Sequence, residues 1–600
     1  MDNKDQQSAI GKPAILRAQD EIFGFLRQAV AELVGDSVES PATKVGTLDQ
    51  PPDRKLGDLC LPCFFLAKPL GRAPADIAVE LAGKFRPTPL VAAAEATGPY
   101  VNFRFDRDSF SRAVLADILP SDSSYRDRPF ALEVEPQNLL IEYAQPNTHK
   151  DLHVGHLRNV FLGTAAVYLL RAAGHQVAPI SYINDAGAAV AKCLWAYQKY
   201  HDGEEPEGVE ARGKFLGDVY AEADRRVAED ESLKEEVAQF LRSFEAGDEV
   251  AVELWRRTRQ WSLDLFEKTF NELGAPIERY YYESDVVQDG RRVVDDLVKR
   301  GIARVSEGAT IIDLEDVNLG VLIVLKSDGT TLYSTADLAL ATKKFVDYPD
   351  IDSSVYVVDV RQSLYFKQVF ETMRRMGFTK QLVHLAYDFV TLKGGAMSSR
   401  KGTVIKYTDF RDEMLKLAES ETRSRHADWE GERVHEIAWT LVEGAMKFTM
   451  LRQDAERPIV FDLQEALSFD GFTGPYVQYA HARLSSIQAK DGGPVMAEAS
   501  VSGSFSEEEF AALRQVADLP RTIAMAVGVG SDRGFNGFNP SVLAQYAFDL
   551  AQRSNDFYRD VPVLSAEGED RERRLAIVEA VRQSLERSLQ LLGISAPREM

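Results

Sequence analysis

Apolar residues recur at helical spacing near the start of the chain and at strand-like spacing further on. Between residues 14 and 34 they return every three or four positions, which predicts a helix with one buried face. Val101, Phe103 and Phe105 alternate with polar neighbours, as in a half-buried strand. The polar stretch 117–130 is typical of a linker. We therefore expect an α+β module over residues 1–115.

The middle of the chain begins with a β-α-β pattern. An apolar strand at 139–141 precedes a helical run at 157–173, and a second strand follows at 176–183. The turn Asn184-Asp185-Ala186-Gly187 then leads into another helix. This order favours a parallel, doubly wound sheet. The sequence therefore predicts a Rossmann-type α/β domain over residues 131–405.

The rest of the chain is predominantly helical. Residues 196–275 are highly charged and predict a helical insertion with a solvated face. Apolar strands are expected at 310–314 and 321–325, followed by a tight hairpin turn at Asp328-Gly329. We expect connecting helices over 406–470 and an all-α bundle over 471–600.

Composition is that of a large multidomain protein rather than a membrane or disulfide-rich one. The 600 residues are 45% hydrophobic and 27% charged, and about three to five domains are expected for this length. No run of 18 apolar residues exists, the N-terminus lacks a signal-peptide core, and only three cysteines occur. Cys60 and Cys63 match C-x-x-C, which we interpret as packing in preference to redox chemistry. A cytoplasmic location is expected.

The net charge of −23 argues against non-specific binding of nucleic acid, because phosphate neutralisation drives such binding. It leaves room for local basic faces. Any contact with RNA is therefore expected to be confined to patches and to depend strongly on salt.

A histidine motif marks the start of the predicted helix after the first strand. His153-Val154-Gly155-His156 follows a turn at Pro146-Asn147, so free N–H groups and the helix dipole form an anion site. Gly155 would let a nucleotide lie close to the backbone. His149, His153 and His156 could ligate zinc if they shared a helical face, but the turn at Pro146-Asn147 argues against a shared face, and no metal site is predicted. A capping role without catalysis is the other alternative.

A second motif lies 241 residues after the first. Residues 388–405 contain a β-rich run, a Gly-Gly turn and the cationic loop Met397-Ser398-Ser399-Arg400-Lys401-Gly402. Glycines on both sides allow this loop to move, and its cations could close over a triphosphate. A solvated basic turn is the alternative interpretation.

Together the two motifs resemble those of the arginyl-tRNA synthetases, which are class I aminoacyl-tRNA synthetases. His153–His156 is similar to the HIGH motif, and the cationic loop is similar to the KMSKS loop in its arginyl form. The flanking Glu-Tyr-Ala-Gln-Pro-Asn at 142–147 strengthens the resemblance, which extends over most of the chain. It implies that ATP is bound by His153, Gly155, His156, Met397, Ser398 and Ser399.

The cationic loop departs from the family pattern at two positions. Ala396 stands where the first lysine is usual, and Ser399 stands where many class I enzymes have the second. The charge that stabilises the leaving pyrophosphate must then come from elsewhere, and Lys150 is the best candidate. The catalytic set implied by the resemblance is Lys150, His153, His156, Arg400 and Lys401.

The resemblance also implies a pocket for arginine. Tyr333 and Asp337 are four residues apart, so they share one face of a helix start, and a carboxylate there can pair with a guanidinium. Ala336 replaces the arginine usual in the family. Helix capping is the alternative role for Asp337. The full arginine-binding set is Glu142, Gln145, Asn147, Tyr333, Asp337 and Gln362.

Two regions are expected to contact tRNA. By resemblance, Asn102, Phe105 and Arg107 would face a base of the D-loop, where an aromatic ring can stack; for Phe105, burial in a strand is an equal alternative. The anticodon-reading residues implied in the C-terminal bundle are Tyr476, Gln478, Tyr479, Arg483 and Met600. A packed core stripe explains Tyr476 and Tyr479 equally well.

The function implied is ATP-dependent activation of L-arginine and its transfer to the 3′-terminal ribose of tRNA(Arg), with Mg²⁺ carried by ATP. A monomer is expected. One alternative is an arginine-activating paralogue that no longer charges tRNA, which Ala396, Ala336 and the acidic balance would favour. A non-catalytic RNA-binding scaffold is a weaker alternative.

Overall fold

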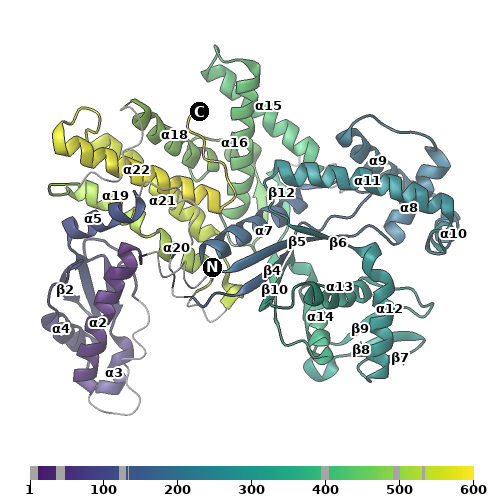
Figure 1. Ribbon diagram of the computed structural model, residues 1–600, viewed down its shortest axis with the longest axis horizontal. Helices are drawn as coiled ribbons and strands as arrows, with labels where there is room; N and C mark the ends of the chain where they lie inside the picture. The colour runs from purple at the N-terminus through teal and green to yellow at the C-terminus, as the bar shows by residue number, and fades with distance from the viewer. Residues whose placement is uncertain are drawn as a thin grey trace.

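The chain is organised as three regions that follow one another in sequence and occupy different parts of the molecule (Figure 1). The computed structural model describes residues 11–34, 48–119, 130, 132, 134–393, 405–490, 501–529 and 534–600. The N-terminal region, purple in Figure 1, lies beside the C-terminal helices, and the parallel sheet lies in the centre. No helix among the described residues is long and apolar enough to span a membrane.

The N-terminal region is a three-stranded antiparallel sheet of order β1-β3-β2, packed against helices. Ile22, Leu26 and Val30 on the first helix are completely buried, which confirms the helix predicted from the apolar spacing. Its elements are α2 (Ala14–Val34), β1 (Leu59–Pro62), α3 (Phe64–Leu70), α4 (Pro74–Lys84), β2 (Val91–Thr97), β3 (Tyr100–Phe105) and α5 (Arg107–Ile118).

The central region is built on a five-stranded parallel sheet of order β11-β10-β4-β5-β6. Chain order runs outward from β4 to β6 and then returns to place β10 on the other side of β4. This reversal creates a topological switch point, where the carboxyl ends of two neighbouring strands diverge and leave a crevice. The predicted doubly wound α/β fold is therefore confirmed. The sheet and its nearest helix comprise β4 (Asn138–Glu142), α7 (Val154–Ala172), β5 (Gln176–Ile183), β6 (Arg279–Tyr282), β10 (Ser353–Asp359) and β11 (Gln381–Tyr387).

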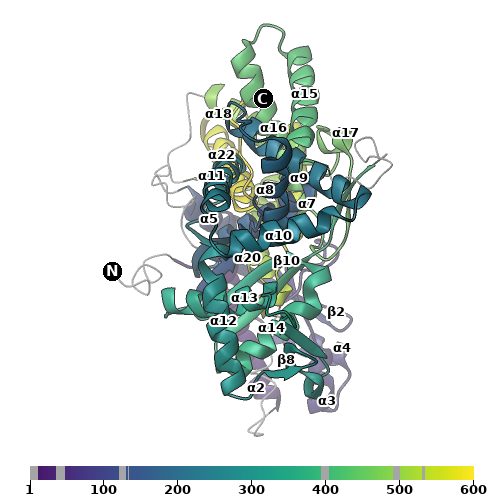
Figure 2. The same ribbon diagram turned by 90° about the vertical axis from the view of Figure 1, so that its right-hand side faces the viewer.

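A helical insertion follows β5, as the charged segment predicted, and it has a core of its own. Leu194, Trp195, Leu216 and Trp261 are buried together there, away from the main core. Figure 2, which looks at the molecule from this side, shows the insertion in front of the sheet. Its helices are α8 (Ala188–Tyr200), α9 (Val209–Glu229), α10 (Leu233–Glu245) and α11 (Glu249–Glu272).

A small antiparallel sheet of order β7-β8-β9 lies between β6 and β10 in sequence. Helices pack on it through Leu297, Leu338 and Met373. The elements are α12 (Glu283–Lys299), β7 (Arg304–Ser306), β8 (Ala309–Asp313), η2 (Glu315–Val317), β9 (Val321–Leu325), α13 (Tyr333–Asp347), η3 (Val360–Gln362) and α14 (Ser363–Met376).

The hairpin predicted at Asp328-Gly329 is only partly correct. The chain does turn back there, with Gly329 at a φ of +79° that suits glycine, and the Lys326 amide donates to the Thr330 carbonyl. The returning segment makes a single bridge, between Leu325 and Thr331. No second strand forms because the Thr335 hydroxyl accepts a hydrogen bond from the Leu332 amide at 3.1 Å and starts α13.

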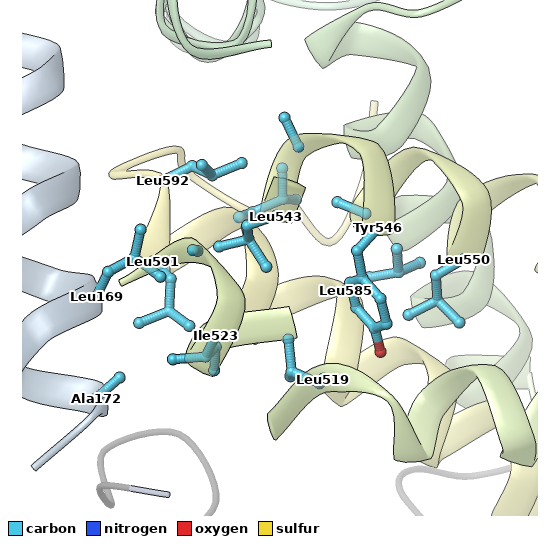
Figure 3. Close-up of a cluster of buried hydrophobic side chains, with 14 of the residues drawn as sticks. Leu169, Ala172, Leu519, Ile523, Leu543, Tyr546, Leu550, Leu585, Leu591 and Leu592 are labelled. Carbon is cyan, nitrogen blue, oxygen red and sulfur yellow. The ribbon is translucent and has the colours of Figure 1, made fainter. Parts of the chain in front are cut away.

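The described residues of the C-terminal region are helical apart from β12 (Val390–Leu392) and β13 (Ile459–Phe461), which pair in parallel. Figure 3 shows Leu519, Leu543 and Leu585 packed in its core beside Leu169 and Ala172 of α7. The bundle is therefore continuous with the central region. Its helices are α15 (Tyr407–Arg425), α16 (Gly431–Leu451), α17 (Leu463–Ala466), α18 (Gly474–Lys490), α19 (Glu507–Ala517), α20 (Leu519–Ala526), η5 (Gly534–Gly537), α21 (Ser541–Asp560) and α22 (Gly568–Leu591).

We expect Gly474→Ala to destabilise the fold by about 1–3 kcal/mol, the usual cost of overpacking. A Cβ at this position would lie 2.3 Å from the Gly444 carbonyl oxygen, where α18 crosses α16. The matched control is Gly24→Ala in α2, where a Cβ meets nothing within 4 Å and helix propensity favours alanine. Thermal unfolding should show a lower Tm for the first variant only; equal Tm values would contradict this account of the crossing.

Candidate active site

A cavity of about 900 Å³ opens at the carboxyl ends of β4 and β10, at the switch point of the sheet. Glu142 ends β4 and Asp359 ends β10, so both strands deliver a carboxylate to the cavity. The first turn of α7 forms a second wall, and the start of α13 forms a third. A crevice of this size at such a position suits a ligand assembled from more than one part.

The first turn of α7 presents two imidazoles to the cavity. His153 is the N-cap residue, and its Nδ1 accepts a hydrogen bond from the Gly155 amide at 3.1 Å. The Nδ1 of His156 accepts from the His153 amide, also at 3.1 Å. Because both Nδ1 atoms are acceptors, each neutral ring carries its proton on Nε2 and can donate it.

Both rings are neutral at physiological pH. They stack with centroids 3.7 Å apart. Burial, together with the nearby Arg361 guanidinium, lowers the pKa of His153 to about 4, and burial beside His153 lowers the pKa of His156 to about 3. The turn therefore offers uncharged donors that sit at the positive end of a helix dipole.

Gly155 is required by the packing of this turn. A Cβ there would lie 3.0 Å from two ring atoms of His153. Any larger residue would displace the imidazole that caps the helix. The glycine between the two histidines of the motif is thus explained by contact, since the His153 ring lies against it.

His149 does not join the other two histidines. Its φ is +62°, and its ring bonds Thr148 and, at 2.8 Å, Thr258 of α11. The zinc alternative required the three imidazoles to share a face, and they do not. No group of three or more His, Cys, Asp or Glu side chains that could hold a metal occurs in the described part of the chain.

The opposite wall of the cavity is acidic. Asp337 accepts a hydrogen bond from the Tyr365 hydroxyl, and burial raises the pKa of Asp337 to about 7. Glu283, the first residue of α12, does not line the cavity, but it is buried near Asp337, and its pKa is raised to about 7 by burial and by the Asp185 and Asp337 carboxylates. Asp337 lies in the second turn of α13 rather than at its cap, so the capping alternative does not apply.

Glu142 is held by a lysine that has no contact with solvent. The Lys344 ammonium donates to Oε2 of Glu142 at 2.5 Å and lies 4.0 Å from the ring centroid of Tyr356. The other carboxylate oxygen, Oε1, accepts from Gln145 Nε2 at 3.3 Å. The ion pair satisfies a charge that would otherwise be costly to bury.

The loop after β4 is strained and held in place by Asn159 of α7. Ala144 has a φ of +55°, which is rare for a residue with a side chain. Its amide donates to Asn159 Oδ1 at 2.6 Å, and Asn159 Nδ2 donates to the Val357 carbonyl at 2.6 Å. Such strain tends to occur at functional sites. It carries Gln145 and Asn147 into the cavity wall.

Many of the predicted site residues meet in this one cavity. Those that line it are Glu142, Gln145, Asn147, His153, Gly155, His156, Tyr333, Asp337 and Gln362. Tyr333 stands at the rim with 62% of its side chain exposed. Residues 396–401, including Met397, Ser398, Ser399, Arg400 and Lys401, lie outside the described residues.

Lys150 is not among the residues that line the cavity. Its ammonium lies 4.5 Å from the ring centroid of Tyr220 in α9, and burial lowers its pKa. Among the described lining residues, Arg361 is the one with a permanent positive charge, and it forms a two-pronged ion pair with Asp359.

Several site residues were not predicted from the sequence. Asn159 lies three residues after the histidine motif, Arg361 directly precedes Gln362, and Lys344 lies seven residues after Asp337, on the same helical face. That spacing could have identified Lys344. Tyr182, Tyr365 and Tyr387 also line the cavity, and no local pattern marks them.

The residues expected to contact tRNA divide into buried and exposed groups. Phe105 is 5% exposed and stacks on Phe110 with centroids 4.3 Å apart, so the structure favours the buried-strand alternative. Asn102 is buried, and Gln478 is buried while donating to the carbonyls of Thr440 and Ser595. In this conformation these three side chains cannot reach RNA.

The exposed group retains access to solvent. Arg107 pairs with Glu507 at the surface, Arg483 lies over the Tyr558 ring, and Tyr479 is 42% exposed. Tyr476 is partly buried, and its hydroxyl accepts from Asn555. Met600 is partly exposed at the chain end.

Comparison with known families gives matches along most of the chain. Residues 117–463 match the catalytic domain of the class I tRNA synthetases of type R, residues 22–105 match the arginyl tRNA synthetase N terminal domain, and residues 477–600 match the DALR anticodon binding domain. The catalytic match extends to residue 463, so it includes most of the segment 406–470 that was expected to connect the catalytic domain to the C-terminal bundle.

Similar proteins are named as arginine–tRNA ligases. The chain is 38% identical to the one from Bdellovibrio bacteriovorus over 96% of its own length and 98% of the relative, and 32% identical to the one from Clostridium perfringens over 96% and 100%. The structure of the Thermus thermophilus arginyl-tRNA synthetase matches with a TM-score of 0.76 at 28% identity, covering 96% of this chain and 100% of that one. The chain therefore belongs to the arginyl-tRNA synthetase family, the class I arginine–tRNA ligases.

Proposed function

We propose that the cavity activates L-arginine with ATP and that the chain transfers the arginyl group to the 3′-terminal ribose of tRNA(Arg). The observation that carries the proposal is the meeting of an acidic wall and a pair of imidazole donors in one cavity. The acidic wall suits a cationic amino acid, and the helix N-terminus suits phosphate. The two proposed binding sites would be adjacent, as adenylate formation requires.

Asp337 would bind the arginine guanidinium. Its carboxylate lines the cavity, and Tyr365 fixes its orientation through a hydrogen bond. Glu283, a buried neighbour of Asp337, adds negative potential when it is ionised. Tyr333 and Gln362 would provide further contacts at the rim. A planar cation with a fork of donors matches such a site better than an ammonium does.

The α-amino end of arginine would bind at Glu142 and Asn147. Lys344 occupies one carboxylate oxygen of Glu142, which leaves Oε1 to exchange Gln145 for the substrate ammonium. In this arrangement the substrate carboxylate would face the α7 histidines. Gln145 would then contact the main-chain atoms of the substrate.

The chemistry would be a displacement at the ATP α-phosphate. An arginine carboxylate oxygen forms the new bond to phosphorus, the α–β bridging bond breaks, and pyrophosphate leaves. Such transfers depend on positioning and on neutralising charge. The Nε2–H groups of His153 and His156 would donate to phosphate oxygens. Lys150, Arg400 and Lys401 remain the candidates for the charge on pyrophosphate, with Mg²⁺ on the nucleotide.

Transfer to tRNA would use the two appended regions. Matches to both the N-terminal and the anticodon-binding domains support tRNA(Arg) as the partner. Arg107, Tyr479 and Arg483 are the predicted contacts that remain exposed. We also propose a monomer in the cytoplasm, and the three cysteines, all free and buried, accord with a reducing compartment. The comparisons give no support to the paralogue that has lost tRNA charging.

We expect arginine-dependent ATP–pyrophosphate exchange and charging of tRNA(Arg) by the intact protein. The measurement is exchange with and without tRNA, together with aminoacylation. Exchange without any charging would favour the activating paralogue. No exchange in either condition would favour the RNA-binding scaffold.

We expect Asp337→Asn to raise the KM for arginine about 100-fold and to leave the KM for ATP within about twofold, because an uncharged isostere leaves the guanidinium without its counter-ion. The matched control is Asp347→Asn on the same helix, whose carboxylate pairs with Arg279 outside the cavity. An unchanged KM for arginine in the first variant would refute this role.

We expect the KM for arginine to rise as the pH falls from 8 to 6. The pKa of Asp337 is about 7, so below this pH the empty site holds a proton that must leave when the guanidinium, which keeps its charge, binds. Glu283, with a similar pKa, acts in the same direction. For each group, the KM for arginine should rise at most about tenfold per unit of pH. A KM that stays constant from pH 8 to 6 would contradict ionised binding.

A further inference from the structure

With Arg514, Arg158 is one of the two largest buried side chains in the described structure, and it is 1% exposed. Its guanidinium donates to four backbone carbonyls. Nη1 bonds Asp388 at 2.5 Å and Phe389 at 3.4 Å, and Nη2 bonds Asp454 at 3.3 Å and Ala455 at 2.8 Å. Within the described part of the chain no carboxylate forms an ion pair with it.

The four carbonyls belong to two segments that lead into the β12–β13 pair. The Asp388 amide donates to the Ala455 carbonyl at 2.9 Å, and the Ile459 amide donates to the Phe389 carbonyl at 3.0 Å. Phe389 and the strand β12 that follows it line the cavity. Arg158 therefore holds one wall of the active site from behind.

The wall that carries the two imidazoles belongs to the same helix as Arg158. His153 and His156 lie in the first turn of α7, and Arg158 lies in the turn that follows. The first turn of α7 also holds Ile405, another residue of the cavity wall, because the Val154 amide donates to the Ile405 carbonyl at 3.2 Å. The distance between the histidines and β12 is therefore set by α7 itself.

Burying a charge between two segments costs free energy, because the charge loses its hydration. Burial lowers the pKa of Arg158 to about 10, so the guanidinium is still charged at neutral pH. An apolar side chain of similar volume would fill the space at lower cost. What the guanidinium adds is direction: its planar fork fixes the backbone of both segments at once.

We propose that Arg158 is a positioning residue for the bound nucleotide. It fixes the wall formed by Phe389 and β12 relative to the imidazole donors of His153 and His156, and it acts through the backbone without touching the substrate. The proposal rests on the proposed function in taking this nucleotide to be ATP.

The test is Arg158→Lys, with Arg171→Lys as the matched control. Arg171 lies in the last turn of α7, donates to the Val177 carbonyl at 2.8 Å and pairs with Glu278, outside the cavity. A lysine keeps the charge at 158 but cannot span both pairs of carbonyls. We expect the KM for ATP in pyrophosphate exchange, with tRNA present, to rise about tenfold or more, and the KM for arginine to stay within about twofold. The control should change neither value.

A purely structural role would give a different result. A KM does not depend on the fraction of folded enzyme, so partial unfolding cannot imitate the expected change. A lower Tm with both KM values unchanged, or an equal rise in both, would overturn the proposal. If the wild-type protein shows no exchange, the proposed function fails, and calorimetric titration with ATP then tests Arg158 alone: weaker binding by Arg158→Lys supports the positioning role, and equal binding refutes it.

Discussion

The structure depends on the need to satisfy polar groups that α7 buries in its first two turns. A buried donor without a partner costs about 1–3 kcal/mol, and a buried charge costs more. Arg158 finds its partners in the segments before β12 and β13, and Asn159 finds them in the strained loop after β4 and at Val357 of β10. Segments more than 200 residues apart in sequence are thus bound to one helix turn. The cavity exists where they meet.

Helix α13 applies a similar constraint to the other side of the cavity. Asp337 and Lys344 lie two turns apart on one face; the first faces the cavity and the second holds Glu142 at the end of β4. One rigid helix therefore relates the proposed acceptor for a guanidinium, Asp337, to the proposed acceptor for an ammonium, Glu142. Such an arrangement can select a substrate by the distance between its two cationic groups, because neither acceptor is free to move independently.

Local sequence patterns predicted many helices and strands, but they did not predict which strands pair or which distant side chains are in contact. The spacing of apolar residues predicted α2 and β5, the charged stretch 196–275 predicted the helical insertion, and the motifs predicted residues that line the cavity. The pairing of β4 with β10 depends on a connection of more than 200 residues, and the spacing of apolar residues does not predict such a distant partner. Gln478 carries no local sign of burial, since it bonds carbonyls of α16 and of the chain end. Phe105 is covered in part by Arg514, a residue of another region.

The central claim is that arginine and ATP bind side by side between α13 and the first turn of α7. A crystal structure of the protein with arginine and a non-hydrolysable ATP analogue tests it most directly. The account predicts the guanidinium at hydrogen-bond distance, about 3 Å, from Asp337, and phosphate oxygens at a similar distance from Nε2 of His153 and His156. An amino acid bound in the reverse orientation, or a nucleotide bound away from α7, would contradict it.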